Sequence, residues 1–407
     1  MRCVRAGADF RASRSKTVHS AAMAANLPGE AARSWRPGGF DMKTEVAKIT
    51  LLPEHFTRAE TVLASYAGLT ASTFRYGTGV AGLRIDNGVG TVELLPFQGQ
   101  QIWDATFDGR RLTMGSMFDE PEPTQCYLGT YGGFFLHCGA TAMGNPSPAD
   151  THPVHGELPN APYHSAELLI GEDEHGPYMG LSGRYRHAVA FTHNYVATPT
   201  LRLHAGSSKI HAEIEIRNLK GSPMDLMYLA HVNFRYVPGG RIVDTVADER
   251  SGYRIRSLLP PEETLTEEYK VLRKAALADP GLHKRLEGTQ RVEPEIVMAM
   301  DVAADPDGWT HALQVLEDGT ADFISYRPDE LGHAIRWMTR NSDQEALGLI
   351  LPATAEADGY LAEKAKGHLV RLDTGETFRC QLVFGALAAE DVPAFERVID
   401  AARTTRV

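Results

Sequence analysis

Apolar and polar residues alternate with a period of two along most of the chain after about residue 80. The alternation runs in short segments rich in Val, Ile, Leu, Phe and Tyr, separated by clusters of Gly, Asn and Asp. The clearest segments are 91–97, 100–107, 166–187, 191–218, 323–339, 345–354 and 377–387. This pattern is typical of antiparallel strands joined by hairpins and meanders, and it does not alternate strands with long helices. We therefore predict an all-β fold, a sandwich of antiparallel sheets with a few short helices.

One strand pair, around the turn 205–209, predicts which faces are buried. Its apolar positions are Leu201, Leu203, Ile210, Ala212, Ile214 and Ile216. Its polar positions are Arg202, His204, His211, Glu213, Glu215 and Arg217. Because successive side chains of a strand point to opposite sides, the first set is expected to pack on a core and the second to face water or a ligand.

Helical spacing of apolar residues predicts three helical segments. The first covers 54–66, the second covers 265–287 with a break at Pro280, and the third covers 394–407. Residues 1–41 are rich in Arg, Ala and Ser and lack the apolar run of a secretory signal, so we expect a disordered N-terminal extension there, with a transit peptide as the alternative. Residues 42–407 are expected to form one β-sandwich domain, and Met42 is a candidate translation start.

Composition and charge narrow the function classes. The chain has 407 residues, 43% hydrophobic and 23% charged, which is typical of a globular protein with a sizeable core. Its formal net charge is −11 and its Lys and Arg residues form no basic stripe, so the pattern of a nucleic-acid-binding protein is missing. No run of about 18 apolar residues predicts a membrane span, and the four cysteines form no C-x-x-C motif, which favours a reducing compartment. We expect a cytoplasmic protein that binds neither nucleic acid nor membranes.

Histidines are numerous, sixteen in all, and the densest group lies in the segment THPVHGELPNAPYH, residues 151–164. Three prolines stiffen this segment, so it is expected to be a rigid loop that can hold a side chain at a fixed angle. His155 precedes Gly156, which marks a position where the backbone must turn or is closely approached. The alternative for His155 is a side chain that only satisfies loop carbonyls.

A second group of polar residues ends an apolar strand. In the run MDLMYLAHVNFRY, residues 224–236, His231 and Asn233 share one face while Phe234 points to the other, into the core. An unpaired buried polar group costs about 1–3 kcal/mol, so the polar pair is expected to lie in a cleft.

The order of these motifs resembles the aldose 1-epimerase, or galactose mutarotase-like, superfamily. The run from Asn218 through Pro223 to Leu226, followed by His231, Asn233 and Phe234, is similar to N-x-S-x-x-P-x-x-L leading to N-H-x-Y-F-N in that family. HPVHG at 152–156 resembles its L-H-G loop. Residues 91–112 are similar to its first hairpin, and LDTGETF at 372–378 to the segment that opens its last strand. The four matches keep the family's order from about residue 85 to 385, and they point to the bacterial aldose 1-epimerase-like branch of unknown function.

The resemblance implies a galactose mutarotase-like β-supersandwich and a site that interconverts sugar anomers. In that chemistry a carboxylate takes the proton of the anomeric hydroxyl while a histidine protonates the ring oxygen. By match, His231 is the general acid, and His155 holds the ring oxygen or a neighbouring hydroxyl and shares that role. No cofactor and no metal are implied.

The chain departs from the family at the base. Leu351 stands where a glutamate is expected, so Glu356, in the loop just beyond that strand, is the candidate substitute base; the alternative is a solvated loop acid. The sugar-binding N-R pair is also missing, and His137 is the candidate that takes over its function. Asn233, Asp244 and Trp337 complete the substrate-binding candidates, with Trp337 stacking on a sugar face unless it belongs to the core.

Three functions remain open at this point: an anomer-interconverting enzyme acting on a small sugar or sugar derivative, a sugar sensor without catalysis, and a metal-dependent cupin-like sugar isomerase. The missing glutamate motivates the second. The third depends on histidines that would have to converge on a metal with a carboxylate. They are His137, His152, His155, His164, His193 and His204. The sequence does not decide the oligomeric state.

Overall fold

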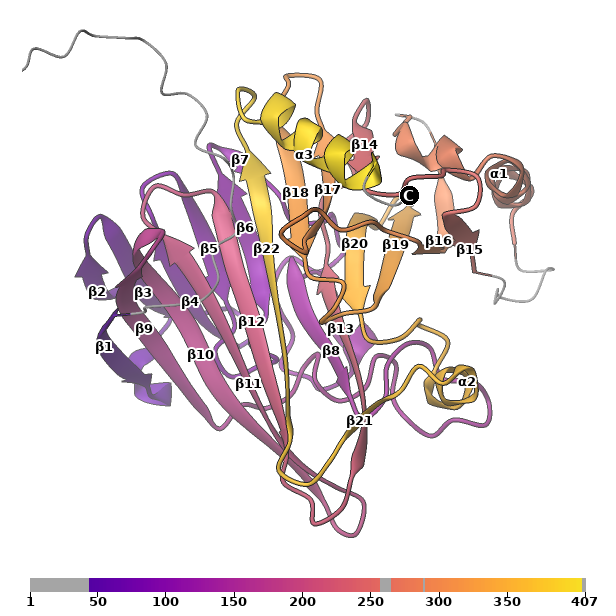
Figure 1. Cartoon of the computed structure of the whole chain (residues 1–407). Coiled ribbons are helices and arrows are strands. Elements are labelled where there is room, and N and C mark those ends of the chain that lie inside the picture. The colour runs from indigo at the N-terminus through magenta and orange to yellow at the C-terminus, as the bar shows by residue number, and fades with distance from the viewer. Residues whose placement is uncertain (1–43, 257–264, 288–289, 405–407) are drawn as a thin grey trace, which may run out of the picture. The chain divides into compact units, whose positions relative to one another are not determined.

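Two antiparallel β-sheets form the protein (Figure 1). The structure is a computed structural model that describes residues 44–256, 265–287 and 290–404. All of these lie in one unit, Pro37–Val407. The predicted extension over 1–41 lies outside the described residues, and the boundaries of the predicted domain stay a prediction.

The first sheet has nine strands, all paired antiparallel to their neighbours. In spatial order they are β1 (Thr44–Leu51), β9 (Ser165–Asp173), β10 (Gly176–Val189), β11 (His193–His204), β12 (Lys209–Asn218), β22 (Thr377–Leu387), β18 (Ala321–Tyr326), β17 (Thr310–Val315) and β14 (Arg241–Asp244).

The second sheet has thirteen strands and carries the candidate site. Its main path runs through β15 (Tyr253–Ile255), β16 (Val292–Met300), β19 (His333–Arg340), β20 (Glu345–Ala353), β13 (Met224–Val232), β8 (Phe135–Ala140), β6 (Ile102–Phe107), β5 (Gly90–Leu94), β4 (Ala81–Asp86), β3 (Leu69–Arg75) and β2 (Thr61–Tyr66). The short strands β21 (Val370–Leu372) and β7 (Arg110–Arg111) pair with β13 and β6.

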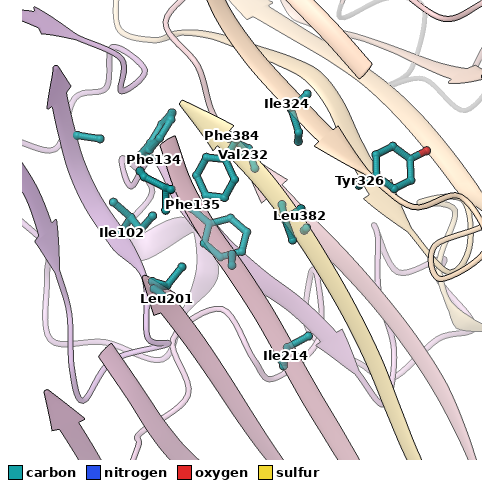
Figure 2. Close-up of a cluster of buried hydrophobic side chains, with 14 of the residues drawn as sticks. Ile102, Phe134, Phe135, Leu201, Ile214, Val232, Ile324, Tyr326, Leu382 and Phe384 are labelled. Atoms are coloured by element: carbon teal, nitrogen blue, oxygen red, sulfur yellow. The ribbon is translucent and has the colours of Figure 1, made fainter. Parts of the chain in front are cut away.

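The two sheets share a hydrophobic core. Phe384 of β22 packs against Phe135 of β8 and against Phe134, the residue before that strand, with ring centroids 5.2 and 5.6 Å away (Figure 2). Aromatic pairs in such edge-on and tilted arrangements add about 0.5–1.5 kcal/mol beyond the area they bury. The six apolar positions predicted on the strand pair β11 and β12 are all buried in this core. The predicted all-β sandwich is confirmed.

The polar face of that strand pair is exposed only toward one end. Glu215 and Arg217 are exposed as predicted, but Arg202, His204 and His211 are buried. His204 contacts Asp173 with 2.8 Å between Nε2 and Oδ1, so a partner from β9 covers the buried end.

Two of the three predicted helical segments are confirmed. Helix α1 (Glu267–Ala278) and the 3-10 turn η4 (Pro280–Lys284) are separated at Pro280, as its missing N–H requires. Helix α3 (Val392–Thr404) covers the described part of the third segment. Among the described residues there are also a short helix, α2 (Tyr360–Lys366), and the 3-10 turns η1 (Pro53–His55) and η2 (Tyr127–Gly129).

The predicted helix over 54–66 is wrong. A single 3-10 turn at Pro53–His55 is followed by strand β2, whose residues pair with β3 in the register Thr61 with Thr73. β-branched residues favour strands, and pairing with a neighbour overrides a weak helical spacing.

No helix in the described ranges has the length and apolar character needed to cross a membrane. The three cysteines that fall in those ranges, Cys126, Cys138 and Cys380, are free thiols.

A buried ion pair joins the sheets. Arg336 of β19 donates from Nη2 to Oδ2 of Asp244 in β14 over 2.8 Å, and both side chains are fully buried. Asp244 also accepts from the Tyr253 hydroxyl at 2.8 Å, and Lys284 lies 3.3 Å away. Burial alone would raise the pKa of Asp244, but the charges of Arg336 and Lys284 outweigh it and hold the pKa well below its ordinary value. Asp244, expected to bind substrate, is thus engaged inside the sandwich.

Removing this carboxylate should destabilise the whole protein. We expect Asp244→Ala to lower the free energy of unfolding by about 3–5 kcal/mol, because Arg336 is left charged and buried without its partner. Urea denaturation measures the change. Glu215→Ala is the matched control, since it removes an exposed carboxylate 2.6 Å from Arg379 and should cost less than about 1 kcal/mol. If the two variants lost the same free energy of unfolding, the buried ion pair would not be stabilising the protein by joining the sheets.

Candidate functional site

A cavity of about 240 Å³ lies on one face of four neighbouring strands, β16, β19, β20 and β13. The opposite face of these strands packs on the core that the sheets share. Residues from η2 and from the loops around 145 and 155 form the remaining walls. The side chains on its wall that can carry chemistry are His155, His231, Arg256, Glu295, Trp337 and Tyr131.

His155 and His231 meet in this cavity although 75 residues separate them along the chain. Their ring centroids are 5.5 Å apart and the rings are nearly perpendicular, at 86°. Two imidazoles at this distance can contact the same small ligand.

The backbone of the 152–158 loop fixes His155. Its φ is +58°, a left-handed conformation that few residues other than glycine adopt. The His155 carbonyl accepts from the N–H of Gly139 in β8 at 2.9 Å, and the His155 N–H donates to the carbonyl of Gly144 at 3.0 Å. Gly156 follows at φ +76°, with its α-carbon so close to the backbone of Ala142 that a Cβ would lie 2.3 Å from that carbonyl oxygen. The predicted close approach at Gly156 is confirmed.

Asn233 fixes the tautomer of the neutral His231 ring. The Asn233 amide donates from Nδ2 to the carbonyl of Gly133 at 2.9 Å, so its Oδ1 faces His231 Nδ1 at 2.5 Å. An amide oxygen only accepts, so Nδ1 carries the hydrogen, and in the neutral ring Nε2 keeps its lone pair. Asn233, expected to bind substrate, is itself buried and acts on His231.

Both imidazoles are neutral near pH 7. Burial lowers the pKa of His231 to about 4, and the hydrogen bond to Asn233 offsets only part of that shift. Burial also lowers the pKa of His155 well below its ordinary value, and the neighbouring His231 ring and the positive charge of Arg256 disfavour its protonated form further. Each ring therefore enters a reaction as a proton acceptor or a neutral hydrogen-bonding group.

One carboxylate lines the cavity among its described residues, and it belongs to Glu295 of β16. The Trp337 indole donates from Nε1 to Glu295 Oε2 at 2.7 Å. The same indole contacts His231, with 5.2 Å between ring centroids. Arg256 approaches Glu295 to 3.9 Å and donates from Nε to Asp358 at 2.7 Å. The carboxylate and the histidine thus contact the same indole.

Sequence reasoning missed Glu295. The available signal was the run RVEPEIVMAM, residues 291–300, in which two glutamates flank Pro294 at the start of an apolar strand. Leu351, where the resemblance led us to expect a glutamate, lines the same cavity. The apolar side chain at that position therefore shares the cavity with a carboxylate from a different strand.

The other predicted side chains lie outside the cavity. Glu356 lies 2.7 Å from the Lys366 ammonium and lines a neighbouring cavity. His137 is buried, with Nδ1 2.7 Å from the Tyr228 hydroxyl. Of the predicted site residues, His155, His231 and Trp337 line the cavity together.

The histidines considered for a metal do not converge. Within the described ranges, the only group of three or more His, Cys, Asp or Glu side chains with ligand atoms close enough to share an ion is Glu356, Glu363 and His368. The Lys366 ammonium already lies 2.7 and 2.8 Å from the two carboxylates of that group.

Comparison with known proteins identifies the fold. A family model described as "Domain of unknown function (DUF4432)" matches residues 77–386. No curated protein matches the sequence. The structure of a candidate aldose 1-epimerase from Klebsiella pneumoniae aligns with 88% of this chain and 96% of its own, at 17% identity and a TM-score of 0.73. A galactose mutarotase-like protein from Clostridium acetobutylicum aligns with 79% of this chain and 99% of its own, at 12% identity and a TM-score of 0.51. These likenesses confirm the galactose mutarotase-like fold.

A methyl group at Gly156 should disturb the loop that carries His155. We expect Gly156→Ala to lower the free energy of unfolding by well over 1 kcal/mol, because the new Cβ meets backbone oxygens and the positive φ strains any side chain. Thermal or urea unfolding measures the loss. Gly176→Ala is the control, since Gly176 has φ +101° with nothing within 4 Å of its Cβ position, so it reports the strain of φ alone. Equal losses at both positions would show that the close contact at Gly156 has no effect.

Proposed function

Because the chain belongs to the DUF4432 family, whose description gives no activity, we propose its function from the geometry of the site: it interconverts the anomers of a sugar, the reaction of an aldose 1-epimerase. The observation that carries this proposal is the meeting of two neutral imidazoles and one carboxylate in a cavity of about 240 Å³. An indole and two tyrosines on its walls offer the flat apolar contacts that suit the C–H face of a sugar ring.

We assign the proton transfer to His231. Its Nε2 has a free lone pair, so it takes the proton of the anomeric hydroxyl as the bond between the anomeric carbon and the ring oxygen breaks. The electron pair of that bond goes to the ring oxygen, which receives the proton from the imidazolium. After rotation of the carbonyl carbon, the reverse steps close the ring on its opposite face. This role differs from the general acid that the resemblance implied, because a ring with a pKa of about 4 is neutral at the start of the reaction and must first take a proton before it can give one.

Glu295 takes the place of the family's carboxylate in this proposal. It lines the same cavity as His231, and its Oε1 is a hydrogen-bond acceptor for a sugar hydroxyl. The indole of Trp337 orients it by donating to Oε2. Glu356, expected as the base, faces Lys366 instead.

His155 and Arg256 are assigned to binding. The His155 ring faces the His231 ring across 5.5 Å, and Arg256 approaches the cavity from the strand edge next to Glu295. Both can donate to the ring oxygen as negative charge develops on it, the kind of stabilisation that is strongest away from water.

Loss of the proposed proton carrier should abolish most of the rate. We expect His231→Ala to lower kcat/KM for mutarotation about 10²–10⁴-fold and Glu295→Gln to lower it by a smaller factor. Polarimetry and saturation-transfer NMR on a panel of aldoses measure the rates. The control is Glu215→Gln, an exposed position on the other sheet, which should match the unaltered protein. The proposal fails if no aldose equilibrates faster than in buffer, and a larger loss in Glu356→Gln than in Glu295→Gln would return the carboxylate role to Glu356.

The pH profile separates the two possible roles of His231. Since its pKa is lowered to about 4, the ring is neutral above that pH and its proton-accepting form is lost as the pH falls through about 4. We therefore expect kcat/KM to stay level from neutral pH to about pH 5 and to fall below it. Circular dichroism at each pH checks that the protein stays folded. A rate that climbs steadily from pH 7 to pH 5 would instead indicate a protonated histidine acting as an acid.

A sugar-binding protein without catalysis is the second candidate, because apolar Leu351 occupies the wall where the family's glutamate is expected. A ligand that binds only the folded state raises stability by RT ln(1 + [L]/Kd). Sugars that raise the melting temperature without changing anomer faster than in buffer would favour this function.

A further inference from the structure

A second cavity, of about 290 Å³, adjoins the first. Four residues line both: Arg256, Val297, Ile335 and Ala357. The two cavities therefore lie side by side, and the Arg256 side chain lines both.

Strand β16 runs along both parts. Its residues Glu295, Val297 and Ala299 are two positions apart and so share one face. Glu295 lines only the first cavity, Val297 lines both, and Ala299 lines only the second. A ligand that lies along this face and reaches past Val297 would extend from the proposed reaction centre into the second cavity.

The second cavity offers many hydrogen-bonding groups, and each cation among its described lining residues is close to a carboxylate. Arg254 donates to Asp301 and Arg256 to Asp358, each over 2.7 Å. The Lys366 ammonium lies 2.7 Å from both Glu356 and Asp358. Because each cation already contacts a carboxylate, a phosphate or carboxylate group on the ligand would gain little.

Neutral hydroxyl groups fit this wall better. A hydroxyl both donates and accepts, so it can accept from guanidinium N–H groups while donating to Glu356 or Asp358. The side chains of Val297, Ala299 and Ile335 supply the apolar surface that the C–H groups of a sugar ring need.

We propose that the second cavity binds a second, uncharged sugar unit, so that the substrate is a reducing disaccharide whose reducing-end ring lies between His155 and His231. This inference rests on the proposed function and adds the substrate class. The first cavity holds the ring that changes anomer, and the second holds the sugar attached to it.

A bulky side chain in the second cavity should lower kcat/KM for disaccharides but not for monosaccharides. Ala299 is half-buried and lines the second cavity alone, so Ala299→Phe places a ring there. We expect kcat/KM for maltose, lactose and cellobiose to fall at least about tenfold, while the values for glucose and galactose stay within about twofold. The control is Ala188→Phe, an exposed position of β10 in the other sheet, which should change neither. Equal losses for disaccharides and monosaccharides, or an unaltered protein that prefers monosaccharides, would overturn the inference.

Isothermal titration calorimetry measures binding directly, so this second test depends neither on turnover nor on the folding of Ala299→Phe. Titration of the unaltered protein with each disaccharide should give a lower Kd than titration with its constituent aldose, and Glu356→Gln should weaken only the disaccharide. Tighter binding of glucose 6-phosphate than of maltose would overturn the inference in favour of an anionic group. If no sugar changes anomer but disaccharides still bind more tightly than aldoses, the proposed activity fails while the second sugar subsite stands.

Discussion

The backbone of Gly139 is the constraint on which the candidate site depends. Its N–H donates to the His155 carbonyl, and its own carbonyl accepts from the N–H groups of Glu157 and Leu158. On its other side β8 pairs with β13, the strand that carries His231, with Tyr228 opposite Gly139. One residue of the sheet thus sets the spacing between the loop that holds one imidazole and the strand that holds the other. Backbone hydrogen bonds therefore position the two chain segments from which the rings project.

The fold was predictable because the alternation of apolar and polar residues depends only on which side of a strand is buried. The six apolar positions around the turn at 205–209 are buried as the pattern predicts, and the break at Pro280 follows from a missing N–H. The segment 54–66 was misread because its apolar spacing fits a helix weakly, whereas the outcome depends on β3, which pairs with β2 on both sides of an irregularity between Val62 and Ala64. The pattern of residues within one segment carries no information about a neighbouring strand that can pair with it.

The candidate site was predictable only in part, for a related reason. His155 and His231 stood out through their neighbours: prolines and a glycine for the first, an apolar strand for the second. Glu295 did not, because its place in the same cavity as His231 depends on the order of the strands, and β16 and β13 are separated by β19 and β20 in the sheet. Glu356 was chosen for its nearness in sequence to Leu351, but beyond the strand end the chain turns toward Lys366. Nearness in the sequence therefore did not identify which carboxylate lines a cavity built from four strands.

Two neighbouring residues of strand β19 have different roles. Arg336 points into the sandwich, where it joins the two sheets through Asp244, and Trp337 points the other way and orients Glu295. Since a strand alternates sides at every residue, the requirements of the interior and those of the ligand act on separate positions. The cavity-facing residues of β19, β20 and β16 can therefore change without disturbing the inward-facing residues, so the choice of ligand can diverge among proteins that keep the same interior.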